Sequence, residues 1–436
     1  MLSRRDFLSK SALTAGFLAL SGVSNKILAS KEYKRIEHLS PEVAAADEDF
    51  WTWVRESFTI SDSFINLNNG GVSPQPKVVQ DAHIENYRFC NLGPAYNMWH
   101  LLDAGREPLR AKLAALAGCS PDEIAINRNS TEGLNTIILG LNLKAGDEVV
   151  LGNYDYPHMK TAWQQRERRD GIKLVWIDDF EFPIEDEQKI VDTYAKAITS
   201  KTKIVHITHL INWVGQIVPA RKIADMAHSK GCEVILDGAQ SFAHFDHKIT
   251  DTDCDYYATS LHKWLCAPFG SGMMYVKKDK IKNIWSLLTT DPDSDEKITK
   301  FEYLGTRSFA SELAISNAVD FHTAIGSARK EARLRYLKDY WCNKVKDVPK
   351  IKLYTSMLPQ FSCAIANFGI DGWKAGEIQT KLFDDYKVFT TPIDFRKVDG
   401  VRVSPSVYNS LYELDRLVDG IKAIAAAEPP PPVAKK

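Results

Sequence analysis

Short apolar runs alternate with helical patterns along most of the chain after residue 66. The six clearest runs have the composition of strands covered on both faces, and they lie at 148–151, 173–177, 203–208, 233–236, 256–259 and 272–276. Between them, apolar residues recur with a helical period over 107–117, 157–169 and 220–230, each followed by a glycine that can end a helix. This alternation predicts an α/β fold with a doubly wound, mainly parallel sheet.

The pattern changes after residue 310. A long helical stretch at 311–347 is followed by two apolar runs, 362–368 and 400–403, and by a final helix at 410–427. We expect a large domain over 66–310 and a smaller α+β C-terminal domain over 311–427. The tail at 428–436 contains four consecutive prolines and cannot continue the last helix.

The first 30 residues have the order of a signal peptide. Arg4 and Arg5 precede Phe7 and Leu8, and a charge-free stretch rich in Ala, Leu and Gly covers 11–25. The paired arginines resemble the twin-arginine signal, which predicts export of the folded protein to the periplasm or beyond by the twin-arginine machinery. The apolar stretch is shorter than the roughly 20 residues that span a bilayer, so no stable membrane span is expected. A retained anchor and a basic tail before a helix are the alternatives.

Charge and cysteine spacing exclude several classes of function. The chain has 55 Lys and Arg against 56 Asp and Glu, with no basic stripe, so nucleic acid is not an expected partner. The 7 cysteines include no C-x-x-C pair. His206 and His209 would lie on opposite faces of a strand and are interpreted as core residues, so no metal site is predicted.

Two polar groups follow predicted strands at the edge where ligands bind in open α/β sheets. Asp237 ends the run at 233–236 and precedes Gly238, and Lys263 follows the run at 256–259. Most lysines are solvated surface charges. Lys263 is flanked by His262 and Trp264, and loss of solvation there would lower its pKa and free the neutral amine that forms a Schiff base.

These two segments resemble the class V aminotransferase family of pyridoxal 5'-phosphate (PLP) enzymes, in its isopenicillin N epimerase-like branch. The matching motifs are Asp-Gly-Ala-Gln at 237–240 and Ser-Leu-His-Lys-Trp at 260–264, and the resemblance covers about 66–417. It implies a fold-type-I PLP-dependent transferase whose N-terminal arm, 31–65, joins the small domain. It also implies a homodimer with active sites at the subunit interface.

The resemblance assigns catalytic roles to Lys263, as the Schiff-base lysine, and to Asp237, as the partner of the pyridine nitrogen. Gln240 matches a contact to the ring oxygen, and Ser260 and His262 match phosphate ligands. A cap and a core histidine are the structural alternatives for the last two.

A second polar segment opens an apolar helix and contains Ser130, Thr131 and Glu132. Ser or Thr there is an ordinary N-cap, but a helix N-terminus also binds anions, and the resemblance implies that this segment holds the cofactor phosphate. It also implies that Tyr156 stacks on the cofactor ring, that Asn212 lies close to it, and that Thr306 reaches the phosphate in the neighbouring subunit.

Arg402 is the expected anchor of a substrate carboxylate, because a guanidinium matches a carboxylate with two hydrogen bonds. It lies in a segment that resembles the C-terminal signature of the family, and an outward arginine on a strand is the alternative. Asn69, in the Asn-Asn-Gly-Gly segment at 68–71, resembles a residue near the substrate.

The resemblance implies an enzyme that forms an external aldimine with an amino acid and labilises a bond at Cα, of the epimerase, aminotransferase or C–S lyase type. The alternative is a non-catalytic exported binding protein with the same fold. Cysteine desulfurases carry a nucleophilic Cys on the loop before the arginine, and residues 390–400 contain none, which makes persulfide chemistry the weaker hypothesis.

Overall fold

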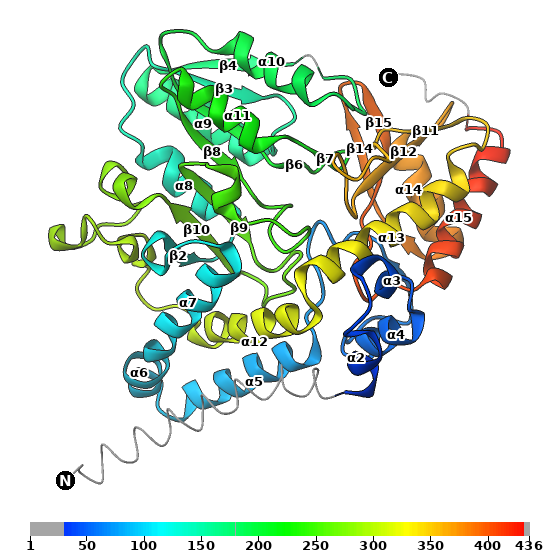
Figure 1. The fold of residues 1–436 in the computed structure, drawn as a ribbon, viewed down its shortest axis with the longest axis horizontal. Coiled ribbons are helices and arrows are strands. Elements are labelled where there is room, and N and C mark those ends of the chain that lie inside the picture. The colour runs from blue at the N-terminus through cyan, green and yellow to red at the C-terminus, as the bar shows by residue number, and fades with distance from the viewer. Residues whose placement is uncertain (1–29, 179, 431–436) are drawn as a thin grey trace.

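A seven-stranded sheet forms the centre of the larger part of the molecule (Figure 1). The computed structural model describes residues 30–178 and 180–430, so nearly all of the predicted signal peptide and most of the proline-rich tail lie outside the described residues. The strand order is β2-β10-β9-β8-β5-β3-β4; β10 is antiparallel to both neighbours and the other pairs are parallel. The predicted α/β fold with a mainly parallel sheet is confirmed. The strands are β2 (Ile124–Asn127), β3 (Glu148–Gly152), β4 (Lys173–Ile177), β5 (Thr202–Thr208), β8 (Glu233–Asp237), β9 (Tyr256–Ser260) and β10 (Gly272–Val276).

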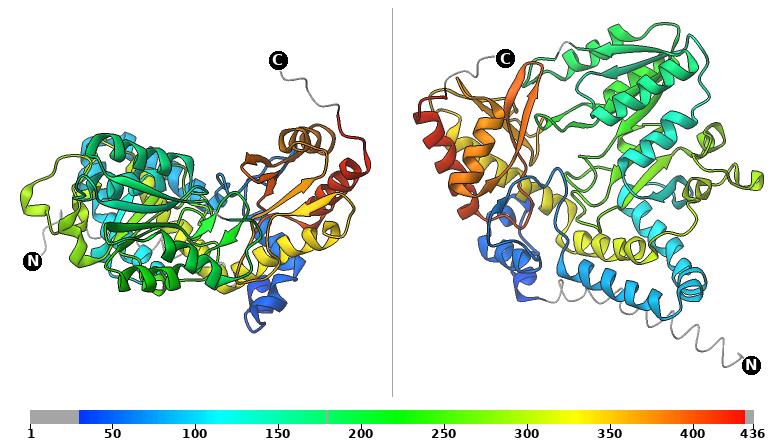
Figure 2. Two further views of the ribbon diagram at one scale, coloured as in Figure 1. Left: turned by 90° about the horizontal axis from the view of Figure 1, so that it is seen from above. Right: turned by 180° about the vertical axis from the view of Figure 1, so that it is seen from behind.

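Helices cover both faces of this sheet (Figure 2). Alternate strand residues serve the two sides: Val150 and Val205 lie in one apolar cluster, and Val149 and Ile204 in the other. The first cluster is completed by α7 (Arg106–Ala117), α10 (Glu187–Ala197), α11 (Ala220–Ser229) and α12 (Phe309–Ile325), and the second by α8 (Ser130–Gly140) and α9 (Pro157–Asp170).

The predicted helix at 311–347 is wrong as a single element. Gly326 has φ 92° and separates α12 from α13 (Ser327–Val345), because that backbone conformation interrupts a helix. Helix α12 packs against α5 (Lys77–Leu92) and contributes to the core of the large sheet. Helix α13 packs instead against the N-terminal arm and α15 (Leu411–Ala426). The break therefore turns the chain from the large sheet to the small one.

A four-stranded antiparallel sheet forms the smaller part, with strand order β11-β12-β15-β14. Its strands are β11 (Ile351–Leu353), β12 (Ala366–Ile370), β14 (Thr391–Phe395) and β15 (Val398–Val403), and α14 (Ala375–Tyr386) packs on it together with α15. The predicted runs differ from the strands at their ends: β12 begins at Ala366, and β15 begins at Val398.

The N-terminal arm lies against this smaller part (Figure 1). Its helices are α2 (Lys31–Ile36), α3 (Pro41–Ala45) and α4 (Glu48–Glu56), and β1 (Ile65–Asn66) pairs in parallel with β13 (Val388–Phe389). Arg333 of α13 donates to the Ala45 and Asn409 carbonyl oxygens (3.0 and 3.3 Å). A buried guanidinium thus ties the arm, α13 and the C-terminal segment together.

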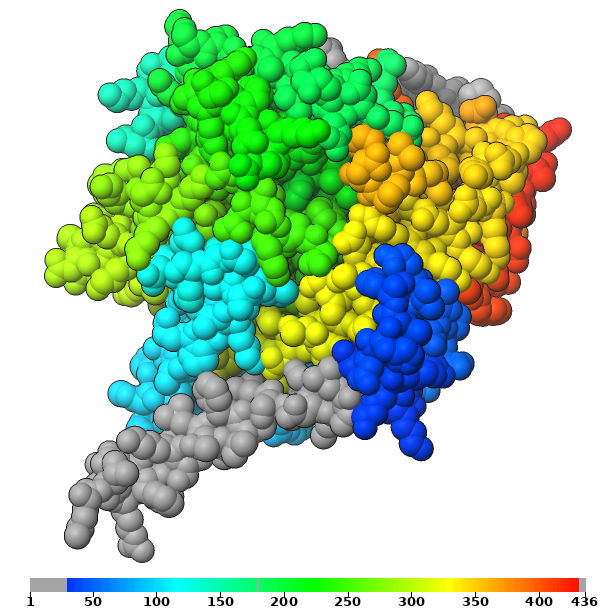
Figure 3. Space-filling view, in the orientation of Figure 1, coloured from blue at the N-terminus to red at the C-terminus, as the bar shows by residue number. Residues whose placement is uncertain are grey.

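The larger and smaller parts of the molecule lie against each other, and the space-filling view shows their surfaces adjoining on one face (Figure 3). The hairpin of β6 (Leu210–Ile211) and β7 (Gln216–Ile217) follows β5 and reaches the smaller part, where Ile217 donates its amide to the Phe361 carbonyl oxygen (2.8 Å). Lys330 of α13 donates to the carbonyl oxygen of Trp264, next to Lys263. The described helices include none long and apolar enough to cross a membrane.

Candidate active site

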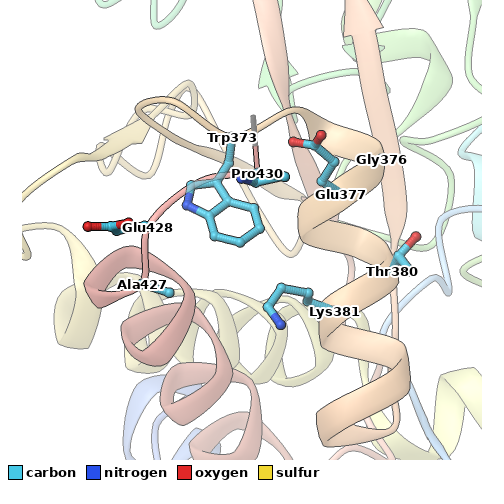
Figure 4. A pocket seen from close by; sticks show the side chains of 8 residues that line it. All are labelled: Trp373, Gly376, Glu377, Thr380, Lys381, Ala427, Glu428 and Pro430. Atoms are coloured by element: carbon cyan, nitrogen blue, oxygen red, sulfur yellow. The ribbon is translucent and has the colours of Figure 1, made fainter. Parts of the chain in front are cut away.

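Two hollows differ sharply in the chemistry that lines them. A groove of about 530 Å³ lies between α14 and the residues after α15, and the side chains along it include Trp373, Glu377 and Lys381 (Figure 4). A second cavity, of about 510 Å³, contains Asp237, Lys263 and Arg402 among its lining residues. Because several buried charged groups converge only in the second cavity, it is the candidate active site.

This cavity lies between the carboxyl ends of the large sheet and the edge of the small one. Thr208 ends β5, Asp237 ends β8, and Lys263 follows Ser260 at the end of β9. Arg402, from β15, faces them from the small sheet. The topology therefore brings together polar residues from segments far apart in the sequence, at the edge where doubly wound sheets bind ligands.

Lys263 and Asp237 form the electrostatic centre of the cavity. Burial lowers the pKa of the Lys263 amine to about 8, an effect opposed by the Asp237 carboxylate and increased by the Arg402 guanidinium. Burial likewise raises the pKa of Asp237, opposed by the Ala239 amide, which donates to Oδ1 (2.9 Å), and by Lys263. A fraction of the Lys263 amine is thus neutral at physiological pH and able to act as a nucleophile.

Arg402 is a buried cation whose partners are all uncharged. Its Nη1 donates to the Asn212 carbonyl oxygen (3.2 Å) and its Nη2 to Asn68 Oδ1 (2.7 Å) and, weakly, to Thr391 Oγ1 (3.5 Å). Its Nε is buried and has no partner among the described residues. Burial lowers the pKa of Arg402 to about 10, opposed by nearby Tyr156. Such a guanidinium has free capacity to bind an anion.

The N-terminus of α8 faces the cavity and offers hydrogen-bond donors to an anion. Asn129 caps the helix by accepting from the Glu132 amide (2.9 Å), and Ser130 and Ser260 are joined through their hydroxyls (3.0 Å). Ser130, Thr131 and Ser260 all line the cavity. The Asn cap, two hydroxyls and the positive end of the helix dipole fit a phosphate.

A rigid stack supports the segment that carries Lys263. The indole of Trp264 lies on the His244 ring, with centroids 3.6 Å apart and planes 8° from parallel. Trp264 Nε1 donates to Gln240 Oε1 (2.9 Å), and Gln240 Nε2 donates to the Gly70 carbonyl oxygen (2.7 Å). His262 also lines the cavity, with Nδ1 3.1 Å from the Ser271 carbonyl oxygen, and burial lowers its pKa.

The mouth of the cavity carries aromatic side chains. Tyr156 is 41% exposed and lines the cavity, as Asn212 does. Trp213 stacks on Phe395 of β14 at 4.8 Å, and its Nε1 donates to the Tyr154 carbonyl oxygen (2.6 Å). This wall joins the large sheet to the β14–β15 hairpin.

Three predicted site residues do not line this cavity. Asn69 is fully buried and bonded to Asn66, Ser404 and Tyr408, while its neighbour Asn68 contacts Arg402. The Glu132 amide donates to Asn129 Oδ1, and the Glu132 carboxylate accepts from the Arg128 guanidinium. Thr306 is exposed. His206 and His209, interpreted as core residues, are both buried.

Further parts of the cavity wall were not predicted from the sequence, among them Asn129, Thr208, Trp213 and the segment 391–393. Thr208 ends a predicted strand, so its place at the ligand-binding edge of the sheet could have been predicted. Nothing in the sequence marked the segment 391–393, because β14 was not predicted. Trp213 follows Asn212 directly, and only the contact with Phe395 distinguishes it from an ordinary core residue.

The cavity fits the expected cofactor. Asp237 is buried and, within the described part of the chain, forms no ion pair with an arginine or histidine, which suits a carboxylate that meets a protonated ring nitrogen. Lys263 would hold the aldehyde carbon, and the N-terminus of α8 with Ser260 would hold the phosphate.

Comparison with known proteins agrees with this arrangement. Isopenicillin N epimerase of Amycolatopsis lactamdurans is 25% identical over 398 residues, which cover 86% of this chain and 98% of that protein. A probable cysteine desulfurase of Synechocystis sp. is 27% identical over 405 residues, covering 85% and 94%.

Two solved structures share the fold. One is C-DES with glycine covalently linked to its PLP cofactor (TM-score 0.75, 20% identity, 84% of this chain and 98% of that chain). The other is the apo cysteine desulfurase from Thermococcus onnurineus NA1 (TM-score 0.74, 22% identity, 87% and 98%). The pattern of the aminotransferase class-V family matches residues 65–417. The chain therefore belongs to the aminotransferase class-V family of enzymes, and its cofactor is pyridoxal 5'-phosphate.

Proposed function

We propose that the protein binds an amino acid through its α-carboxylate and labilises a bond at the substrate Cα. The observation that carries this proposal is Arg402, a buried guanidinium with an unpartnered Nε and no acidic partner, placed across the cavity from Lys263 and Asp237. A buried cation without a counter-ion is costly, and an α-carboxylate would supply the missing charge.

The roles of the other residues follow from their positions. The cofactor, when bound, supplies an electron sink for charge that develops at the substrate Cα. Asp237 would hold a proton on the ring nitrogen by its negative charge. Lys263, with its lowered pKa, would hold the cofactor through its neutral amine, and the same amine is placed to take up or return a proton at the substrate Cα.

The reaction belongs to the epimerase, aminotransferase or C–S lyase type. The similarity to isopenicillin N epimerase, at 25% identity, favours chemistry at Cα. The identity to a probable cysteine desulfurase is about equal, at 27%, so identity alone does not choose between these reactions. None of the 7 cysteines lines the cavity, which weighs against a persulfide mechanism. A non-catalytic binding protein is not favoured, because it would not need both Lys263 and Asp237 in this geometry.

We further propose that two copies of the chain form the working enzyme. Exposed apolar side chains gather on α5, on α6 (Pro94–Tyr96) and on the π-helical turn after it: Ile84, Tyr87, Leu92, Tyr96 and Trp99. A surface of this kind is typical of a protein interface. The solvent-facing Thr306 fits a role in a partner's site.

Export by the twin-arginine route completes the proposal. Its support is the order Ser3-Arg4-Arg5-Asp6-Phe7-Leu8 in the sequence. These residues lie outside the described residues. The route suits a protein that acquires a cofactor before export.

Replacing Arg402 tests the substrate class. We expect Arg402→Ala to weaken binding of an amino acid by roughly tenfold to a hundredfold, because a charged, bidentate hydrogen bond is lost. Arg402→Lys should restore only part of the affinity. The measurement is spectral titration of each variant with an amino acid and with its decarboxylated amine. Equal losses for both ligands would remove the argument for an α-carboxylate.

The lowered pKa of Lys263 gives a pH-dependent prediction. In cofactor-free protein, the rate of covalent PLP attachment should rise with pH through a midpoint near 8, because the neutral amine reacts. Asp237→Asn should lower this midpoint and Arg402→Met should raise it, since the two charges act in opposite directions. Borohydride trapping followed by mass spectrometry measures the rate and locates the adduct. An adduct on another lysine, or a midpoint near 10, would contradict the assignment.

The dimer is tested by mass in solution. Light scattering should give twice the mass of one chain for the wild type and a lower mass for Leu92→Glu/Trp99→Glu, because two buried charges would oppose the interface. Tyr412→Glu is the matched control, since Tyr412 is exposed on α15 of the smaller part. A wild-type monomer would refute the proposal.

The export route is tested by replacing Arg4 and Arg5 with Lys. We expect this variant to remain in the cytoplasm, because the twin-arginine receptor reads the arginine pair. Cell fractionation with immunoblotting measures the distribution. Normal accumulation outside the cytoplasm would exclude this route.

A further inference from the structure

A second buried carboxylate lies beside the candidate active site without lining it. Asp155 is 3% exposed and follows β3, which pairs directly with β5; Thr208 ends β5, and Asp237 ends β8 on the other side of β5. Its position at the carboxyl edge of the sheet places it in the same row of strand ends as those two residues. No sequence motif identified it.

The carboxylate of Asp155 joins two neighbouring strand ends. Its Oδ1 accepts from the Thr208 hydroxyl (2.7 Å), and its Oδ2 accepts from the Gly152 amide (2.8 Å). The Asp155 amide in turn donates to the Gly152 carbonyl oxygen (3.1 Å). Two hydrogen bonds between Gly152 and Asp155 thus close the turn at the end of β3, and the bond from Thr208 joins this turn to β5.

Both ends of this connection reach the cavity. Thr208 lines it directly, and so does Tyr156, the residue that follows Asp155 and precedes the first turn of α9. A displacement of the Asp155 carboxyl would therefore move two wall residues that come from different elements.

The charged and titratable groups around Asp155 do not neutralise it. The positive charge of Lys160 of α9 acts on it, but the Lys160 amine donates to the Asn153 carbonyl oxygen (2.8 Å), and no ion pair with Asp155 occurs among the described residues. Asp237 of β8 and Tyr194 of α10 are the other titratable groups that interact with it. A buried carboxylate without a counter-ion is costly, and its position next to the cavity wall points to a role at the site.

We propose that Asp155 is a positioning residue of the PLP pocket, which fixes Tyr156 and Thr208 at the cavity wall and adds a second negative charge to that of Asp237. Asp155 touches neither substrate nor reacting atoms. It acts through the Thr208 hydroxyl, through the turn at 152–155 and through its charge.

The charge of Asp155 varies in the physiological pH range. Burial raises its pKa from the ordinary 3.8 to about 7; the hydrogen bonds from Thr208 and Gly152 oppose this shift, and Asp237 adds to it. Below that pH the carboxyl is largely protonated and resembles an asparagine in charge. Above it, the carboxylate favours a protonated ring nitrogen beside Asp237.

The experiment measures PLP dissociation constants of cofactor-free protein by absorbance titration between pH 6 and 8.5. Thr208→Val keeps the side-chain shape and removes the donor, and should weaken binding roughly tenfold. For Asp155→Asn, the ratio of its dissociation constant to that of the wild type should be near one at pH 6 and rise to about tenfold at pH 8.5.

Asp255→Asn is the matched control. Asp255 is equally buried and accepts the Val234 amide (2.8 Å), but it precedes β9 and thus lies at the opposite edge of the sheet. The ratio of the PLP dissociation constant of Asp255→Asn to that of the wild type should not change with pH, even if the variant is less stable to heat. A ratio for Asp155→Asn that is constant with pH, or unchanged binding by Thr208→Val, would overturn the proposal.

Discussion

The desolvation of three charged groups, Lys263, Asp237 and Arg402, is the constraint on which the cavity depends. In water each of these groups would keep its ordinary charge, and hydration would weaken its electrostatic interaction with a ligand. Burial between the two sheets lowers the pKa of Lys263 and of Arg402 and raises that of Asp237. Each shift reflects the free-energy cost of keeping the charged form away from water. A ligand with complementary charges would offset that cost, so the cavity is suited to such a ligand.

The architecture maintains this desolvation by closing the cavity from two sides. Parallel strands of the large sheet deliver Asp237 and Lys263 at one edge, and the antiparallel hairpin of β14 and β15 brings Arg402 across from the small sheet. Helix α13 links the two, because Lys330 near its start bonds to the segment of Lys263 while Arg333 bonds to the arm and to Asn409. The relative placement of the two sheets is therefore part of the site.

The sequence predicted the parts of this arrangement that depend on local pattern. Continuous apolar runs located six strands of the large sheet, and the residues that follow two of them, Asp237 and Lys263, proved to lie in one cavity. It could not predict features set by tertiary contacts. The helix break at Gly326 depends on a turn between two cores. The choice of Asn68 over Asn69 depends on which side chain faces Arg402. The role of Asp155 could not be predicted, because it depends on a hydrogen bond from Thr208, 53 residues away in the sequence.

The hairpin that carries Arg402 bears on how this chain differs from its desulfurase relatives. The segment 391–403 is paired residue by residue from Thr391 with Arg402 to Phe395 with Val398, which leaves only Arg396 and Lys397 in the turn. Arg396 adopts φ 57° there, and Phe395 is held against Trp213. A hairpin packed in this way presents Thr391, Pro392 and Ile393 to the cavity, and no cysteine is among its residues. Pro392 and Ile393 therefore give the cavity an apolar surface between the polar groups of Thr391 and Arg402. Lys263, whose pKa burial lowers, faces this wall from the large sheet and is the group that the proposed reaction at Cα would use to move a proton.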